Sequence, residues 1–158
     1  MGKLSLRDKN LIRAASFIGQ KFAKELDLNY SEQSLYVVDA VLAIQLKSSA
    51  VPLETVHKWF SRSTYEALQR FLRDHDEGEL IAGCVNYVGE VVCRNVRGAW
   101  TVRHGFFGGA ELGIDIEDGK RFLPLKELAG IPSKTYIKIR SRIQELSVDR
   151  VELSSKPR

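Results

Sequence analysis

Residues 83–100 read GCVNYVGEVVCRNVRGAW, and this stretch joins the helical first half of the chain to a β-containing second half. Its apolar residues recur at helical spacing as far as Asn95, and a strand pattern begins at Trp100. We therefore predict a helix over residues 79–95. Gly98 is its expected C-cap, because glycine readily adopts the left-handed conformation that ends many helices. Trp100 is expected to anchor the following strand in the core.

Small residues recur along one side of this helix, at positions 82, 86, 89 and 93. The glycine at position 89 requires an explanation, since glycine in a helix interior destabilises the helix by about 1 kcal/mol relative to alanine. We expect it to admit the backbone of another helix. Tyr87 and Glu90 also stand out, but structural roles suffice for both, and Glu90 is spaced to form a local ion pair with Arg94, worth only a few tenths of a kcal/mol if it is exposed. The stretch is predicted to be a structural frame without catalytic residues.

Further helices are expected before this one, over residues 5–26, 31–47, 52–60 and 63–74. The second of them is apolar almost all round, which favours a central position in the fold. On its helical wheel Asp39 falls with polar residues, so we expect its carboxylate to be exposed to solvent. Partial burial against a helix end or an arginine is the alternative.

Alternating apolar and polar residues predict a three-stranded antiparallel meander over residues 99–104, 110–117 and 120–123. A sheet with one apolar face must pack against helices, so the predicted fold class is α+β. The loop at residues 105–109 is rich in glycine, but it joins two strands and no Gly-Lys-Ser/Thr follows it. It is therefore not a phosphate-binding loop.

Aromatic residues outside the regular apolar patterns are candidate anchors for a protein partner. Phe106 and Phe107 occupy the glycine-rich loop, and Trp59 lies just before the helix expected at 63–74. Each either folds back on the core or projects as an exposed apolar contact.

A last helix is predicted over residues 134–146. Lys134, Lys138 and Arg142 line one outer ridge of it, with Arg140 nearby. A solvated face is the simplest explanation for this ridge, and contact with nucleic acid or with an acidic partner is the alternative.

The chain of 158 residues carries a net charge of +4 and 44% hydrophobic residues, which is typical of one globular domain. We assign residues 1–150 to that domain and 151–158 to a disordered tail. Apolar runs fall short of a membrane span, and no secretory signal core is present at the N-terminus. Cys84 and Cys93 point to opposite faces of one helix and cannot pair, so reduced thiols in a cytoplasmic protein are expected.

The sequence offers no set of residues that names a reaction. His75 and its acidic neighbours are consecutive loop residues and do not make a closed ligand set, while His57 and His104 stand alone. Asp39, Tyr87 and Glu90 are not spaced with these histidines in any catalytic pattern. We therefore expect no catalytic residues, no metal and no cofactor.

Three segments together resemble a group of small bacterial α+β domains with no defined activity. The segments are Leu28–Leu35 with Val38, Asp39 and Leu42; Tyr87–Val92 with Arg94 and Gly98–Trp100; and Asp118–Gly119 with Phe122 and Pro124. The resemblance covers residues 28–128. It implies a bacterial, cytoplasmic protein of helices followed by a small sheet, and it carries over no catalytic residue.

These observations favour a non-enzymatic protein-interaction module of a bacterial cytoplasmic protein, of immunity, accessory or regulatory type. Trp59, Phe106 and Phe107 would contact the protein partner, whose identity the sequence does not give. The alternative is nucleic-acid binding through the last helix, which would weaken steeply with salt.

Overall fold

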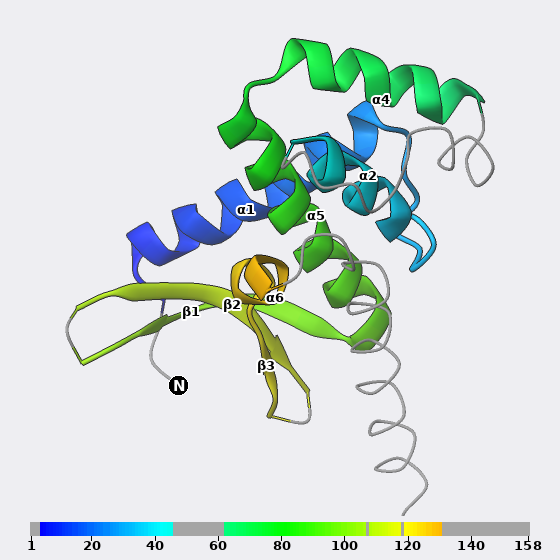
Figure 1. The fold of residues 1–158 in the computed structure, drawn as a ribbon. Helices are drawn as coiled ribbons and strands as arrows, with labels where there is room; N and C mark the ends of the chain where they lie inside the picture. The colour runs from blue at the N-terminus through cyan, green and yellow to red at the C-terminus, as the bar shows by residue number, and fades with distance from the viewer. Residues whose placement is uncertain (1–3, 46–61, 107, 118, 131–158) are drawn as a thin grey trace, which may run out of the picture.

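The computed structural model describes residues 4–45, 62–106, 108–117 and 119–130. Helices come first and a three-stranded antiparallel sheet follows, as expected for an α+β protein (Figure 1). The elements are α1 (Leu6–Glu25), α2 (Leu35–Gln45), α4 (Arg62–Asp74), α5 (Glu77–Val96), β1 (Gly98–His104), β2 (Ala110–Ile116), β3 (Arg121–Phe122) and α6 (Pro124–Gly130). The helices predicted at 52–60 and 134–146 and the tail at 151–158 lie outside the described residues.

Helix α5 is the central element, and it packs against α1, α2, α6, β1 and β2. It begins two residues earlier than predicted, because the Asp76 side chain accepts a hydrogen bond from the Glu79 amide and caps the first turn. It ends at Arg97, which takes the left-handed conformation with φ of 50°. The prediction that Gly98 is the C-cap was therefore wrong.

Gly98 instead opens β1, where a side chain would collide with Ile114 on the neighbouring strand. Gly89 also has a different neighbour from the one predicted. The Trp100 ring and Pro124 occupy the space above it, so no helix backbone approaches there. Trp100 is half-buried and packs against the core, as expected for an anchor of β1.

The close approach of two helices occurs one turn earlier on α5, against α1. A side chain at Gly19 of α1 would lie 2.7 Å from the backbone oxygen of Asn86 and from Glu90 Cγ. Gly83 leaves room for the Phe22 ring in the same interface. Glu90 is consequently buried, at 5% exposure, and it forms the predicted i,i+4 ion pair with the half-exposed Arg94 at 3.8 Å.

Helix α2 is buried on several sides, and this corrects the prediction for Asp39. The side chain is 4% exposed, because α2 packs against both α5 and α4 and its polar side is covered as well. The helix also starts later than expected. Ser31 caps a preceding turn by accepting the Ser34 amide, and α2 proper begins at Leu35.

The core is one cluster that runs from the helices to the inner face of the sheet. Phe22 packs edge-on against Phe71 of α4, with ring centroids 5.2 Å apart, and lies at the same distance from Tyr87. The Tyr87 hydroxyl is hydrogen-bonded to Ser34. None of the helices within the described ranges is long and apolar enough to cross a membrane.

The sheet has the predicted meander order, β1-β2-β3. β1 and β2 pair along their whole length, from Gly98 opposite Ile116 to His104 opposite Ala110. β3 is much shorter and pairs with β2 only at Ile114 and Asp115 within the described chain. The β1–β2 hairpin therefore extends beyond β3 and α6, and its tip projects from the body of the molecule (Figure 1).

Candidate functional site

A groove with a volume of about 750 Å³ lies beside the distal half of the β1–β2 hairpin. We call it the hairpin groove. Its lining residues are Val85, Asn86, Trp100, Arg103, His104, Gly105, Gly109–Leu112 and Leu123–Lys126. The volume lies within the range of ligand-binding pockets, roughly 300–1,000 Å³.

The groove follows from the way the chain leaves the sheet after β3. Pro124 cannot donate to a strand ladder and is well suited to begin a helix, so α6 starts there and turns away from β2. Val85 and Asn86 of α5 line the groove on the helical side, and Trp100 lines it from β1. Leu125 of α6 remains 66% exposed at its edge. The groove thus combines an apolar lining with incomplete cover.

The tip of the hairpin carries the most exposed apolar side chain in the described chain, that of Phe106. Gly105 and Gly109 at the tip line the groove, so the loop that carries Phe106 adjoins it, while the Phe106 ring itself projects into solvent. The Gly105 amide donates to the Gly109 carbonyl and closes the tip. Of the two arrangements considered for Phe106, the structure has the exposed one.

An Asp–His pair ties the hairpin to α1 at the rim of the groove. His104 Nε2 lies 2.9 and 3.1 Å from the two carboxylate oxygens of Asp8, which is buried in the first turn of α1. The hydrogen bond from His104 lowers the pKa of Asp8 despite that burial. Ser5 Oγ accepts the Asp8 amide hydrogen and caps the helix. Serine, histidine and aspartate therefore do not form a relay of the serine-hydrolase type here.

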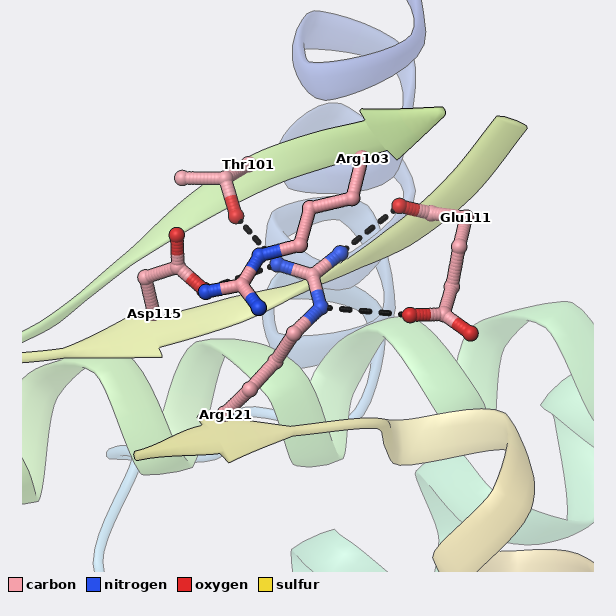
Figure 2. Close-up of polar contacts among 5 residues, drawn as sticks. All are labelled: Thr101, Arg103, Glu111, Asp115 and Arg121. Atoms are coloured by element: carbon pink, nitrogen blue, oxygen red, sulfur yellow. Dashed lines mark hydrogen bonds and ion pairs between the residues drawn. The ribbon is translucent and has the colours of Figure 1, made fainter. Parts of the chain in front are cut away.

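The outer face of the sheet carries a polar network centred on Arg121 (Figure 2). Arg121 Nη1 donates to Asp115 at 2.8 Å and to Thr101, and Arg121 Nη2 donates to the Glu111 carbonyl at 2.7 Å. The Glu111 carboxylate lies 3.3 Å from Arg121 Nε. Gly113 makes this possible, since a side chain there would lie 3.0 Å from the Arg121 guanidinium carbon.

This network is built for structure and has little capacity for a ligand. Arg121 is only 10% exposed and nearly all its donors are occupied. Asp115 also receives Arg103 at 3.1 Å. Burial opposes ionisation of Asp115, but the hydrogen bonds and charges of its partners outweigh burial and hold its pKa below the usual value. The network locks the short β3 onto β2.

A second polar cluster joins α1 to the start of α5. His75 Nδ1 lies 2.7 Å from Glu79, and His75 Nε2 lies 2.7 Å from Glu25. The bond to Glu79 and then that to Glu25 raise the pKa of His75, although burial opposes them. The carboxylates engage opposite sides of the ring, so they do not converge on one point. No group of three or more potential metal ligands is present in the described part of the chain.

The buried thiols are unreactive by environment. Burial and, second, the charge of Asp39 raise the pKa of Cys84 far above its usual range. Burial, followed by Glu90, raises the pKa of Cys93 to about 12. The cysteines are unpaired, as expected from their spacing. Because only the thiolate is an effective nucleophile, neither is a candidate catalytic residue.

The structure brings few of the residues singled out from the sequence into one place. Trp100 lines the hairpin groove and Phe106 lies on the loop that adjoins it, whereas Asp39, Tyr87 and Glu90 are interior residues of the helical half. Other candidates lie outside the described residues, namely Trp59, Phe107, Lys134, Lys138, Arg140 and Arg142.

Sequence reasoning missed the groove itself. Leu112 and Leu125 do not stand out in the sequence, but together with Leu123 they line the groove. One signal was available in the sequence. Pro124 ends the third strand early, so the third strand is too short to pair with the whole of the longer second strand. Comparisons with protein-family models, curated proteins and solved structures gave no match.

Proposed function

We propose that the chain is a non-enzymatic interaction module that binds a protein partner through the hairpin groove and the Phe106 tip. The observation that carries this proposal is a fully exposed phenylalanine on the loop that adjoins a largely apolar groove of about 750 Å³. Exposed aromatic side chains next to an apolar recess are typical of the centres of protein interfaces. A bacterial cytoplasmic protein of immunity, accessory or regulatory type would use such a surface to mask or to scaffold its partner.

The chemistry of the polar groups supports a binding role over catalysis. Asp8 and His104 bind each other, Arg121 is saturated by Thr101, Glu111 and Asp115, and the thiols are protonated. An active site needs a nucleophile, an acid or base and a stabilising group in mutual reach. The described residues present no such set around the groove.

The test is capture of partners from the native cell by the tagged protein, followed by mass spectrometry. The double variant Phe106→Ser/Leu125→Ser removes exposed apolar groups at the groove. Phe17→Ser is the matched control, because Phe17 is as exposed as Leu125 but lies on α1, outside the groove. We expect the double variant to lose a partner that the wild type and Phe17→Ser retain. Retention by all three proteins, with circular dichroism unchanged, would remove the groove as the binding surface.

Nucleic-acid binding is the second candidate function, and one observation on α1 supports it. Lys9, Arg13, Lys21 and Lys24 are exposed on this helix together with Phe17. Basic groups interspersed with an aromatic ring suit single-stranded nucleic acid, whose phosphates and bases they would contact.

Reversing the charge of Lys9 and Arg13 tests the contribution of α1, and reversing Lys134 and Lys138 separately tests the last helix. Binding of a labelled oligonucleotide should fall steeply between low and high salt and should fall further in the responsible variant. Equal binding by the wild type and both variants would exclude this function.

A further inference from the structure

Among the described residues, one edge of β2 has no paired strand over half of its length. β1 covers the other edge completely, from Ala110 to Ile116. On the β3 side, the described residues cover only the second half of β2: Ile114 and Asp115 pair with β3, and the Ile116 amide donates to Lys120. The segment Ala110–Gly113 continues past the end of β3 along this edge, and it is the part of β2 that lies against the hairpin groove.

The backbone N–H and C=O groups of Ala110 and Leu112 in this segment point toward the groove side. The Ile116 amide donates to the Lys120 carbonyl, so its N–H points away from β1 and toward β3. Backbone direction alternates along a strand, which turns the N–H and C=O groups of Leu112 and Ala110 the same way. At the tip, the Gly105 amide donates to the Gly109 carbonyl. The backbone N–H and C=O groups of the odd-numbered residues of β2 therefore point toward β1.

The register explains why β3 does not cover this edge. Phe122 pairs with Ile114, so Pro124 would fall opposite Leu112. Proline has no N–H to donate to the Leu112 carbonyl, and it begins α6 instead. Unpaired strand edges are templates for another strand. The recess that follows, between β2 and Leu123–Lys126, is the hairpin groove.

We propose that an extended, acidic and apolar segment of a protein partner adds to the Ala110–Leu112 edge of β2, in line with β3. Strand addition of this kind takes its affinity from backbone hydrogen bonds and its specificity from side chains at alternate positions. Alternate side chains of the added strand would contact Trp100 and Leu125 in the groove. This inference rests on the proposed function and specifies its binding mode.

Charge decides between a partner segment and a second copy of this chain. The groove is lined by two basic residues, Arg103 and Lys126, and by one acidic residue, Glu111, and the chain as a whole has a net charge of +4. Pairing two copies edge to edge would bring the same cationic groups together, whereas an acidic segment would neutralise them. Charge complementarity therefore favours a different protein, and not a second copy of this chain, as the source of the added strand.

A synthetic peptide of sequence EVTVTVE, blocked at both ends, is the probe. Its control is the same peptide N-methylated at alternate residues along the edge that would pair, which removes those backbone donors while the side chains stay. Binding is measured by amide hydrogen exchange and NMR shifts on the full chain. We expect fast exchange at Ala110 and Leu112 in the absence of peptide and protection of both by roughly tenfold at saturation. The methylated peptide should bind roughly tenfold more weakly.

Two substitutions at one position separate the backbone from the side chain. Ala110→Pro removes an outward N–H, while Ala110→Val keeps it, and Ala110 is exposed so that both are accommodated. We expect the proline variant alone to weaken peptide binding.

Protection of Ala110 and Leu112 before peptide is added would show that the edge is already covered, and it would overturn the proposal. Equal binding of both peptides, no binding at millimolar peptide, or a concentration-dependent dimer that protects these amides would overturn it as well. If strand addition fails while Phe106→Ser/Leu125→Ser still abolishes partner capture, only the binding mode is wrong. If capture is unaffected by that variant, the proposed function itself falls.

Discussion

Gly89 supports the Trp100 ring on the surface of α5, and the two residues define the junction of helix and sheet. Gly89→Ala should therefore destabilise the protein, even though alanine favours a helix by about 1 kcal/mol over glycine. The added methyl group would displace the indole, and overpacking of this kind costs about 1–3 kcal/mol. Urea unfolding measures the change.

Gly78→Ala on the same helix is the matched control. A Cβ at Gly78 would have only an ordinary contact with Asp76, at 3.5 Å. This variant should be neutral or slightly more stable than the wild type. If Gly89→Ala were also neutral, the Trp100 contact would not require glycine.

His75 makes stability depend on pH. Its folded-state pKa is raised above the ordinary value for histidine, first by the bond to Glu79 and then by that to Glu25, against an opposing effect of burial. The protonated ring therefore stabilises the fold fully below about pH 6.5, and this contribution is lost as pH rises through the raised pKa. His75→Gln should lower the free energy of unfolding by about 1 kcal/mol more at pH 6 than at pH 8. The melting temperature should accordingly fall further at pH 6. An equal loss at both pH values would mean that protonation of His75 contributes nothing.

The burial of single side chains and the position of the helix cap were harder to predict from the sequence than the helices and strands themselves. Asp39 was expected in solvent because its wheel position is polar, but coverage by both α4 and α5 depends on tertiary packing that a wheel does not contain. The same reason explains the buried Glu90. The left-handed C-cap is Arg97, and Gly98 lies in β1, where Ile114 leaves no room for a side chain. Ile114 is distant in sequence, so a local pattern does not reveal this contact.

β3 is an element of two residues whose attachment depends on one side chain. Arg121→Lys keeps the charge but loses the planar group that reaches Thr101, Asp115 and Glu111 together. We expect a loss of about 1–2 kcal/mol in the free energy of unfolding, since buried charge-assisted hydrogen bonds are broken.

Arg103→Lys is the control for charge on the same face. Arg103 is more than half exposed and its ion pair with Asp115 is partly exposed to solvent, so its replacement should cost less than about 0.5 kcal/mol. Equal losses in the two variants would show that the guanidinium geometry of Arg121 is unimportant.

Element identity and order followed from local patterns. The alternation of apolar residues placed β1 and β2, and the helical spacing placed α1, α4 and α5 within two residues of their observed ends. The hairpin groove did not follow, because it arises from unequal strand lengths and from the direction in which α6 leaves the sheet. Those are relations between elements, and periodicity within one element does not contain them.

For the molecule as a whole, the thiols report on global opening. Cys84 is fully buried and Cys93 half-buried, and burial keeps both protonated. At pH 8 the native protein should react slowly with a disulfide reagent, Cys93 before Cys84, and both thiols should react rapidly in urea. Single Cys84→Ser and Cys93→Ser variants assign the two rates. Rapid reaction of both thiols without denaturant would contradict the packing described for α5.

The central position of α5 also has a consequence for how the protein melts. Its two sides are shared, since the same helix completes the helical core against α1 and α2 and supports β1, β2 and α6. Neither half can lose its structure while leaving the other with an intact partner surface. Heating should therefore give one cooperative transition, with far-ultraviolet ellipticity and near-ultraviolet tryptophan signals changing at the same temperature. The residues that join two halves in the sequence would in this way make them a single thermodynamic unit.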